Sequence, residues 1–164
     1  MPTELQPASE EDRPVVQNLA RFYVYDMSEL TGWPCPETGL FGGCDRFFED
    51  WRDGNNEPFL IRVDGELAGF AGVKKMTDGD EAWYCIQEFF VLRKFRRRGV
   101  GTAVAGELFR MHSGKWQIRV LEQNAPAAAF WRAVVNEFAK GAFTETVETH
   151  PAWGAMHAIR FDSR

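Results

Sequence analysis

The chain has 164 residues, 45% of them hydrophobic and 14% aromatic, which is enough for one packed core and predicts a single domain over 1–164. No apolar run approaches the roughly 20 residues that a membrane helix needs, and the first residues lack the features of a signal peptide, so we expect a cytoplasmic protein without a membrane partner. Three scattered histidines and three cysteines without a C-x-x-C pair support neither a zinc site nor a disulfide framework.

The net charge of −5 is unevenly distributed along the chain. Residues 1–60 carry a net charge of −8, whereas residues 61–164 carry +3. This division suits an enzyme that joins a polyanionic cofactor to a cationic second substrate. Solvated acidic helix faces are the commoner explanation of such a division.

The first 56 residues predict a short strand, a helix and an irregular loop. The strand is expected at Thr3–Pro7, and Ser9 with Asp12 predicts the helix cap that follows. Apolar side chains then recur at helical spacing, which predicts one buried helix face: Val16, Leu19, Ala20, Tyr23, Met27 and Leu30. Residues 31–44 are too rich in Pro and Gly for regular structure, and 45–52 are predicted to form a second short helix.

The rest of the chain predicts a mixed sheet with interspersed helices. Asp64-Gly65 between two apolar runs is typical of a β-hairpin formed by 58–63 and 67–73. Alternating strands and helices then follow, with two closing strands: 84–92, 101–112, 116–121, 124–141, 143–148 and 155–161. The order β-α-α-β-β-β-α-β-α-β-β predicts an α/β (α+β) fold with helices on both faces of one sheet.

The segment after the strand at 84–92 has the features of an anion-binding site. Five cationic side chains occupy six positions in 93–98. Gly99 and Gly101 allow a tight turn with unobstructed amides, and Thr102 is placed to cap the next helix. A helix N-terminus beside arginines favours a pyrophosphate. A nucleic-acid patch or a solvated turn are the alternatives, but the overall acidity argues against nucleic acid.

The glycine spacing excludes the two commonest phosphate-binding loops. A dinucleotide fingerprint needs Gly where Val104 stands, and the P-loop pattern is absent. Arg96-x-x-Gly99-x-Gly101 directly after a strand instead resembles the coenzyme A signature of the GNAT acetyltransferase superfamily.

The resemblance covers nearly the whole chain. Asn124, which leads into a helix that contains Phe130-Trp131, resembles the second conserved block of that superfamily. The implied GNAT fold has a central mixed, mostly antiparallel sheet of six to seven strands flanked by about four helices. The implied reaction is transfer of an acetyl group from acetyl-CoA to a primary amine of a small molecule or protein, by direct attack and without a metal.

Residue by residue, the resemblance implies a cofactor site along the strand, the basic loop and the later helix. Main-chain amides at Phe90 and Val91 are implied to bind the acetyl carbonyl and the pantetheine arm. The remaining cofactor-binding residues implied by the family are Arg96, Arg97, Arg98, Gly99, Val100, Gly101, Thr102, Asn124, Phe130 and Trp131. Asn124 is equally well explained as a helix cap.

Glu88 is the candidate catalytic base because it interrupts an apolar strand three residues before Val91, within reach of an amine through a water. A substrate anchor and a structural carboxylate remain open alternatives. Burial would raise the pKa of this carboxyl group. Many relatives have a tyrosine acid where Trp131 stands, and indole cannot supply that proton. Tyr23, Tyr25 or a water are possible replacements, or the thiolate leaves without an acid.

Because the tyrosine acid is absent at Trp131, a second hypothesis stays open, in which the chain is a non-catalytic GNAT-fold module that binds acetyl-CoA. The first helix and the loop after it usually wall the acceptor site in this family. That placement implies that the acceptor-binding residues are Tyr25, Asp26, Glu29 and Trp33. Closing strands of this type often pair across a subunit interface, so we expect a homodimer.

Overall fold

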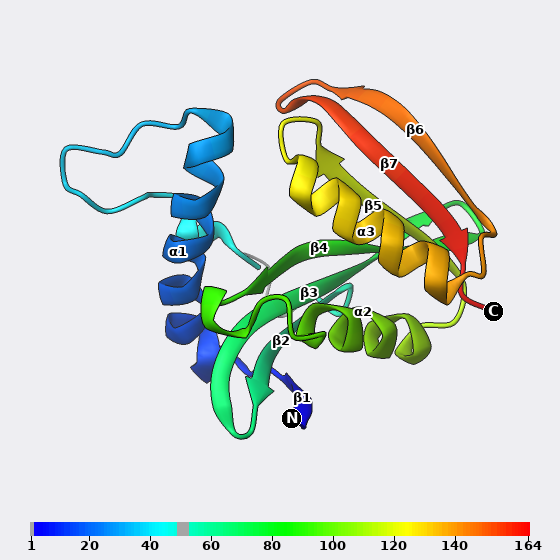
Figure 1. Cartoon of the computed structure of the whole chain (residues 1–164), viewed down its shortest axis with the longest axis horizontal. Coiled ribbons are helices and arrows are strands. Elements are labelled where there is room, and N and C mark those ends of the chain that lie inside the picture. The colour runs from blue at the N-terminus through cyan, green and yellow to red at the C-terminus, as the bar shows by residue number, and fades with distance from the viewer. Residues whose placement is uncertain (1, 49–52) are drawn as a thin grey trace. The chain divides into compact units, whose positions relative to one another are not determined.

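The computed structural model describes residues 2–48 and 53–164, and its strands form one sheet in the order β1-β2-β3-β4-β5-β7-β6 (Figure 1). The strands are β1 Thr3–Pro7, β2 Asn56–Val63, β3 Glu66–Asp78, β4 Glu81–Val91, β5 Lys115–Leu121, β6 Phe143–His150 and β7 Gly154–Asp162. β4 and β5 are parallel, whereas β1 with β2, β5 with β7 and β6 with β7 are antiparallel. The predicted mixed, mostly antiparallel sheet is therefore confirmed.

Three α-helices occur in the described part of the chain: α1 Arg13–Thr31, α2 Val100–Met111 and α3 Ala125–Phe138. Three short 3-10 helices accompany them: η1 Glu10–Asp12, η2 Cys44–Arg46 and η3 Arg93–Phe95. The chain divides into two compact units, Met1–Gly72 with Gln87–Val100 and Val73–Ile86 with Gly101–Arg164. No helix in the described ranges has the length and apolarity needed to cross a bilayer.

In the first unit, the apolar face of α1 packs against the inner side chains of the sheet. Its core contains Val16, Leu19, Ala20, Cys44, Phe48, Leu60, Phe70 and Phe90. The predicted hairpin turn is present, since Asp64 and Gly65 both have positive φ angles of 51° and 79°. Gly32 ends α1 in the left-handed conformation at φ 75°. Leu30, placed on the buried face by its spacing, is 37% exposed near this end.

In the second unit, aromatic rings from two helices and two strands form the core. Phe109 of α2 lies 5.0 Å from Trp116 of β5, 4.8 Å from Phe161 of β7 and 5.1 Å from Phe138 of α3, measured between ring centroids. Ile118 of β5 is paired with Ile159 of β7, and both are fully buried. This packing explains why α2 and α3 form where the sequence predicts helices.

Some predicted boundaries differ from the structure. β3 continues to Asp78 through mostly polar residues, which are partly buried at 74 and 76 and exposed at 75, 77 and 78. The apolar run that ends at 73 did not predict this extension. The helix predicted at 45–52 is a 3-10 turn at Cys44–Arg46 in its described part, and 49–52 lie outside the described residues. α2 begins at Val100, so Thr102 lies within the first helical turn rather than at the cap.

Candidate active site

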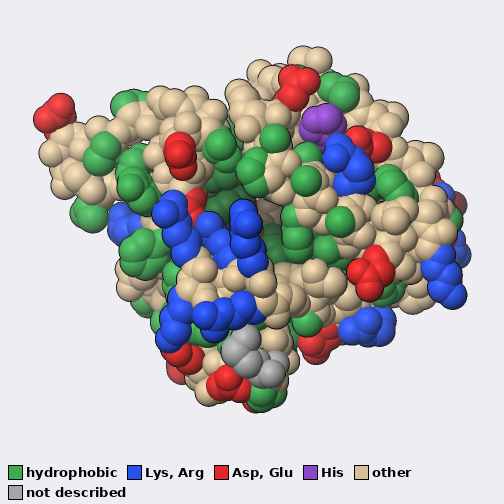
Figure 2. Space-filling model, viewed as in Figure 1, with side chains coloured by type: hydrophobic (Ala, Val, Ile, Leu, Met, Phe, Trp, Pro, Cys, Tyr) green, Lys and Arg blue, Asp and Glu red, His purple; other side chains and the backbone are tan. Residues whose placement is uncertain are grey.

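The predicted anion-binding loop connects the end of β4 to the start of α2. Arg97 and Gly99 take positive φ angles of 59° and 79°, which turn the chain after η3 so that α2 begins at Val100. The first amides of a helix have no acceptor within that helix and carry the positive end of its dipole. Figure 2 shows Lys and Arg side chains gathering on one face around this loop and the start of α2.

Three of the five cations in this loop are held by carboxylates. Asp26 of α1 accepts hydrogen bonds from Arg93 Nη2 at 2.8 Å and from Arg96 Nη2 at 2.6 Å. Lys94 Nζ donates to both carboxylate oxygens of Glu66, at 2.6 and 2.7 Å. Arg97 and Arg98 are exposed and form no ion pair within the described residues. They are therefore the two guanidinium groups best placed to meet an incoming anion.

Arg96 is held by three separate contacts on its own unit. Besides its ion pair with Asp26, its Nε donates to the carbonyl oxygen of Val91 at 2.7 Å. Its guanidinium carbon also lies 5.5 Å from the centroid of the Phe90 ring, a cation–π distance. The Arg96 side chain thus fixes the end of β4 to α1. The position of Arg96 in the coenzyme A signature did not predict this structural role.

Glu88 is a partly buried carboxyl group that contacts a tyrosine. Burial raises its pKa from 4.5 to about 8, and a hydrogen bond with Tyr23 of α1 offsets part of that rise. Burial also raises the pKa of Tyr23 well above its usual value of 10.0, with the charge of Glu88 and the shared hydrogen bond as further causes. A carboxyl group of this pKa exchanges protons near neutral pH.

Phe90 and Val91 follow Glu88 at the buried end of β4, with side chains 4% and 9% exposed. The Phe90 ring lies 5.6 Å from Tyr23 and 5.9 Å from Phe70. Gly69 of β3 runs so close to this point that a side chain there would meet the Phe90 carbonyl oxygen. The backbone of Phe90 and Val91 is thus closely packed against β3.

The expected acceptor residues lie on α1 and just after it. Tyr25 is 59% exposed and Glu29 is also exposed, whereas Trp33 is partly buried. The carboxylate of Asp26 is occupied by the two arginines described above. The structure therefore brings Asp26 together with Arg96 rather than leaving it open to an acceptor.

The three later residues of the predicted cofactor site belong to the second unit. Asn124 is the N-cap of α3, and its Oδ1 accepts a hydrogen bond from the amide of Ala127 at 3.2 Å. Trp131 is 6% exposed and packs near Phe109, with 6.5 Å between ring centroids. Phe130 is partly buried and lies 4.9 Å from Trp131 by the same measure. The cap role of Asn124 is thus present, and Trp131 contributes to a core.

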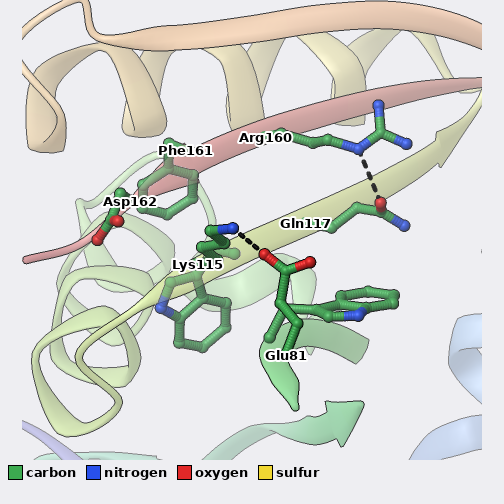
Figure 3. Close-up of a pocket in the computed structure, with 8 residues that line it drawn as sticks. Glu81, Lys115, Gln117, Arg160, Phe161 and Asp162 are labelled. Atoms are coloured by element: carbon green, nitrogen blue, oxygen red, sulfur yellow. Dashed lines mark hydrogen bonds and ion pairs between the residues drawn. The ribbon is translucent and has the colours of Figure 1, made fainter. Parts of the chain in front are cut away.

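A pocket of about 430 Å³ lies in the second unit, where β4 and β5 begin and β7 ends (Figure 3). Glu81 and Lys115 point toward each other there and form an ion pair, and Arg160 Nε donates to Gln117 Oε1 at 2.9 Å. None of the predicted site residues lines this pocket. The other two charged side chains of the pocket are paired outside it, Arg160 with Glu148 and Asp162 with Arg164, so we assign the pocket no part in the chemistry.

Sequence reasoning placed Tyr23 in the core and missed its contact with Glu88. The available signal was its position on the buried face of α1, because a buried tyrosine hydroxyl usually needs a polar partner. Glu88 is the polar side chain that interrupts the apolar strand. The ion pairs of Asp26 gave no such signal, because its partners lie 67 and 70 residues later.

The structure resembles many solved acetyltransferases at low sequence identity. A GNAT-family acetyltransferase from Streptococcus agalactiae is 14% identical, with a TM-score of 0.72 and coverage of 99% of this chain and 96% of that one. Spermidine N-acetyltransferase from Vibrio cholerae, solved with CoA and spermine, is 12% identical with a TM-score of 0.63 and coverage of 98% and 95%. Mycobacterium smegmatis RimJ, solved with CoA-disulfide, is 21% identical, with a TM-score of 0.64 and coverage of 98% and 82%.

A comparison with curated proteins gave no significant match. The family model of the acetyltransferase (GNAT) family matches residues 24–134, which is more than half of the chain and contains Glu88, the basic loop and most of α3. The match also includes the glycine spacing from which the coenzyme A signature was identified. This chain belongs to the acetyltransferase (GNAT) family.

Proposed function

We propose that this protein transfers an acetyl group from acetyl-CoA to a primary amine, with Glu88 as the catalytic base. The observation that carries the proposal is the placement of a carboxyl group of pKa about 8 on β4, three residues before Val91 and on the strand that leads into the basic loop. A base with that pKa accepts a proton from an ammonium group far better than an ordinary carboxylate does.

The proposed cofactor site consists of main-chain and side-chain hydrogen-bond donors that follow one another along the chain. The amides of Phe90 and Val91 receive the acetyl carbonyl and the pantetheine arm. The first amides of α2, at Val100 to Thr102, bind the pyrophosphate together with the guanidinium groups of Arg97 and Arg98. Arg96 contributes by holding the loop in place through Asp26 and Val91. Gly99 provides the left-handed turn that the loop requires.

The reaction proposed is a direct acyl transfer. Glu88 accepts a proton from the amine through a water, the amine nitrogen attacks the acetyl carbon, and the carbon–sulfur bond breaks to release a thiolate. The amides of Phe90 and Val91 stabilise the charge that develops on the carbonyl oxygen. Trp131 is buried in a core and donates no proton to the sulfur, so the thiolate is protonated by water.

A cationic amine is the acceptor class that we favour. Residues 1–60 carry a net charge of −8, and the Vibrio cholerae relative was solved with the polyamine spermine. Tyr25, Glu29 and Trp33 are the proposed acceptor contacts, with Asp26 supporting them from the same helix. We further propose a cytoplasmic homodimer, which sedimentation of the purified protein and fractionation of the producing cells would test.

Calorimetric titration with acetyl-CoA, desulfo-CoA and ATP tests the cofactor site. We expect micromolar binding of acetyl-CoA that Arg98→Glu weakens at least tenfold, because the variant places a negative charge beside the pyrophosphate. Arg110→Glu makes the same charge change at the last turn of α2 and should bind as the native protein does. If Arg98→Glu and the native protein bind acetyl-CoA equally well, the basic loop does not bind the pyrophosphate.

Release of free thiol across a panel of amines then tests the reaction. Turnover with polyamines or other cationic amines, lost in Glu88→Gln, supports the proposed base. The alternative is a non-catalytic acetyl-CoA-binding module, which the absence of a tyrosine at Trp131 favours. Binding of acetyl-CoA without thiol release from any amine in the panel would establish that alternative instead.

A further inference from the structure

The pocket at the start of β4 and β5 takes most of its lining residues from one face of the sheet (Figure 3). Lys115 of β5 lies opposite Trp83 of β4 and Asp162 of β7. Gln117, two residues further along β5, projects to the same face and lies opposite Arg160. The strand register therefore builds this pocket within the second unit, and its volume of about 430 Å³ is in the range of small-molecule sites.

Within the described ranges, every charged side chain that lines the pocket already has an ion-pair partner. The pairs are Glu81 with Lys115, Arg160 with Glu148, and Asp162 with Arg164. A charged ligand would have to compete with one of these pairs, whereas an uncharged ligand leaves all of them intact. The pocket thus favours a ligand without net charge.

Gln117 contributes a hydrogen-bond donor to the pocket. The residue is 8% exposed, and its Oε1 accepts a hydrogen bond from Arg160 Nε at 2.9 Å. Because a guanidinium group only donates, the atom that faces Arg160 must be the oxygen, and the Nε2 group is directed away from it. No acceptor for this Nε2 lies in the part of the chain that the structure describes. A single placed donor favours a ligand that brings an oxygen acceptor.

Trp83 contributes an aromatic surface to the pocket. It is partly buried, and among the described residues no other aromatic ring or cation packs against its indole. Trp116 and Phe161 also line the pocket, but their rings pack in the core against Phe109, with 5.0 and 4.8 Å between centroids. This side of the pocket is therefore fixed by the core, while the Trp83 indole is left for a ligand ring, and aromatic pairs favour offset stacking.

We propose that this pocket is a binding site for an uncharged aromatic or heteroaromatic molecule that carries a carbonyl oxygen. The ring of the ligand stacks on the Trp83 indole, and its carbonyl oxygen accepts a hydrogen bond from Gln117 Nε2. None of the residues proposed above for acetyl transfer lines the pocket, so this site is tested independently of that reaction.

One substitution reverses the hydrogen-bonding character of the site at nearly constant shape. Gln117→Glu keeps an oxygen that accepts from Arg160 and replaces the Nε2 donor with a second oxygen, which repels a carbonyl group. Gln123→Glu makes the same chemical change at an exposed position in the turn after β5 and is the matched control. Trp83→Leu removes the aromatic surface at a partly exposed position, which provides a second test that is independent of how well Gln117→Glu folds.

Titration with benzamide, followed by NMR through the backbone amide and indole N–H shifts, is the test. We expect a Kd on the order of 1 mM, with the shifts centred on 81–83, 115–117 and 160–162. Benzoate carries a charge in place of the amide, and cyclohexanecarboxamide lacks the aromatic ring, so each should bind about tenfold more weakly or worse. Gln117→Glu and Trp83→Leu should each lose about tenfold in affinity for benzamide, whereas Gln123→Glu should bind as the native protein does.

The absence of shifts at about ten times the expected Kd would overturn the proposal. Equal affinities for benzamide and benzoate would overturn it as well, and so would native-like benzamide affinity in folded Gln117→Glu or Trp83→Leu. Failure of the proposed function gives a different result, because a native protein that releases no thiol from acetyl-CoA with any amine would still bind benzamide at this pocket.

Discussion

Replacement of Gly69 by alanine should destabilise the protein at the end of β4. A Cβ atom at this position would lie 3.0 Å from both the carbonyl carbon of Phe90 and the Cα of Val91, and deep inside contact distance of the Phe90 oxygen. All three atoms belong to the backbone and cannot rotate away, so the two strands must separate. We expect Gly69→Ala to reach the upper end of the range for overpacking, about 3 kcal/mol.

For a chain of this length, that loss corresponds to a fall in Tm of about 6–12 °C. Thermal unfolding followed by circular dichroism measures it. Gly42→Ala is the matched control, because a Cβ atom there has nothing within 4 Å, so its Tm should stay within a few degrees of native. The folded Gly69→Ala variant should also lose at least tenfold in kcat/KM, since Phe90 and Val91 are displaced. A Tm for Gly69→Ala within 2 °C of native would refute the close approach of these strands.

Three further predictions concern the site. The pKa of Glu88 lies at about 8 in the folded protein against 4.5 as its ordinary value, so the folded state binds the extra proton between these values and its stability falls as pH rises. Chemical denaturation at pH 5 and pH 9 should show that the native protein loses at most about 5 kcal/mol of its free energy of unfolding between these two values, whereas Glu88→Gln should not. Parallel losses in both proteins would contradict the raised pKa of Glu88. Asp26→Asn should cost about 1 kcal/mol and weaken acetyl-CoA binding severalfold through release of the loop, whereas Glu29→Gln should do neither; native-like binding by Asp26→Asn would show that its ion pairs do not position the loop. Asn124→Ala should lower stability by about 1 kcal/mol through loss of the cap, and Asn124→Asp should retain it; unchanged stability in the alanine variant would argue against the cap.

Local signals accounted for most of the fold. The hairpin at Asp64-Gly65 was predictable because few residue pairs readily adopt two successive positive φ angles. The first α-helix was predictable from its apolar spacing, and the basic loop from its glycines and its place after a strand. The second half of β3 was not, because its polar side chains carry no apolar alternation and the strand depends on pairing within the sheet.

The candidate site was only partly predictable, for a physical reason. Glu88 could be identified as a carboxyl group in an apolar strand, but its partner Tyr23 is far away in sequence and meets it only in the folded chain. The pairing of Asp26 with Arg93 and Arg96 likewise depends on how α1 packs. It occupies the Asp26 carboxylate, which was expected to bind the acceptor, and the Arg96 guanidinium, which was expected to bind the cofactor. Tertiary contacts between distant polar residues leave almost no trace in one sequence.

Residues 87–100 and α1 belong to the same compact unit, which has a consequence for how this enzyme can diversify. The proposed base and most of the cofactor loop occupy one short continuous segment, while the outward face of α1 carries Phe22 and Tyr25 with 56% and 59% of their surfaces exposed. Substitutions at such exposed positions usually change stability by no more than about 0.5 kcal/mol. With the acceptor and cofactor residues assigned as proposed above, amine preference can change on α1 while the proposed acetyl-transfer segment stays constant, and libraries that seek new acceptors should be concentrated on α1.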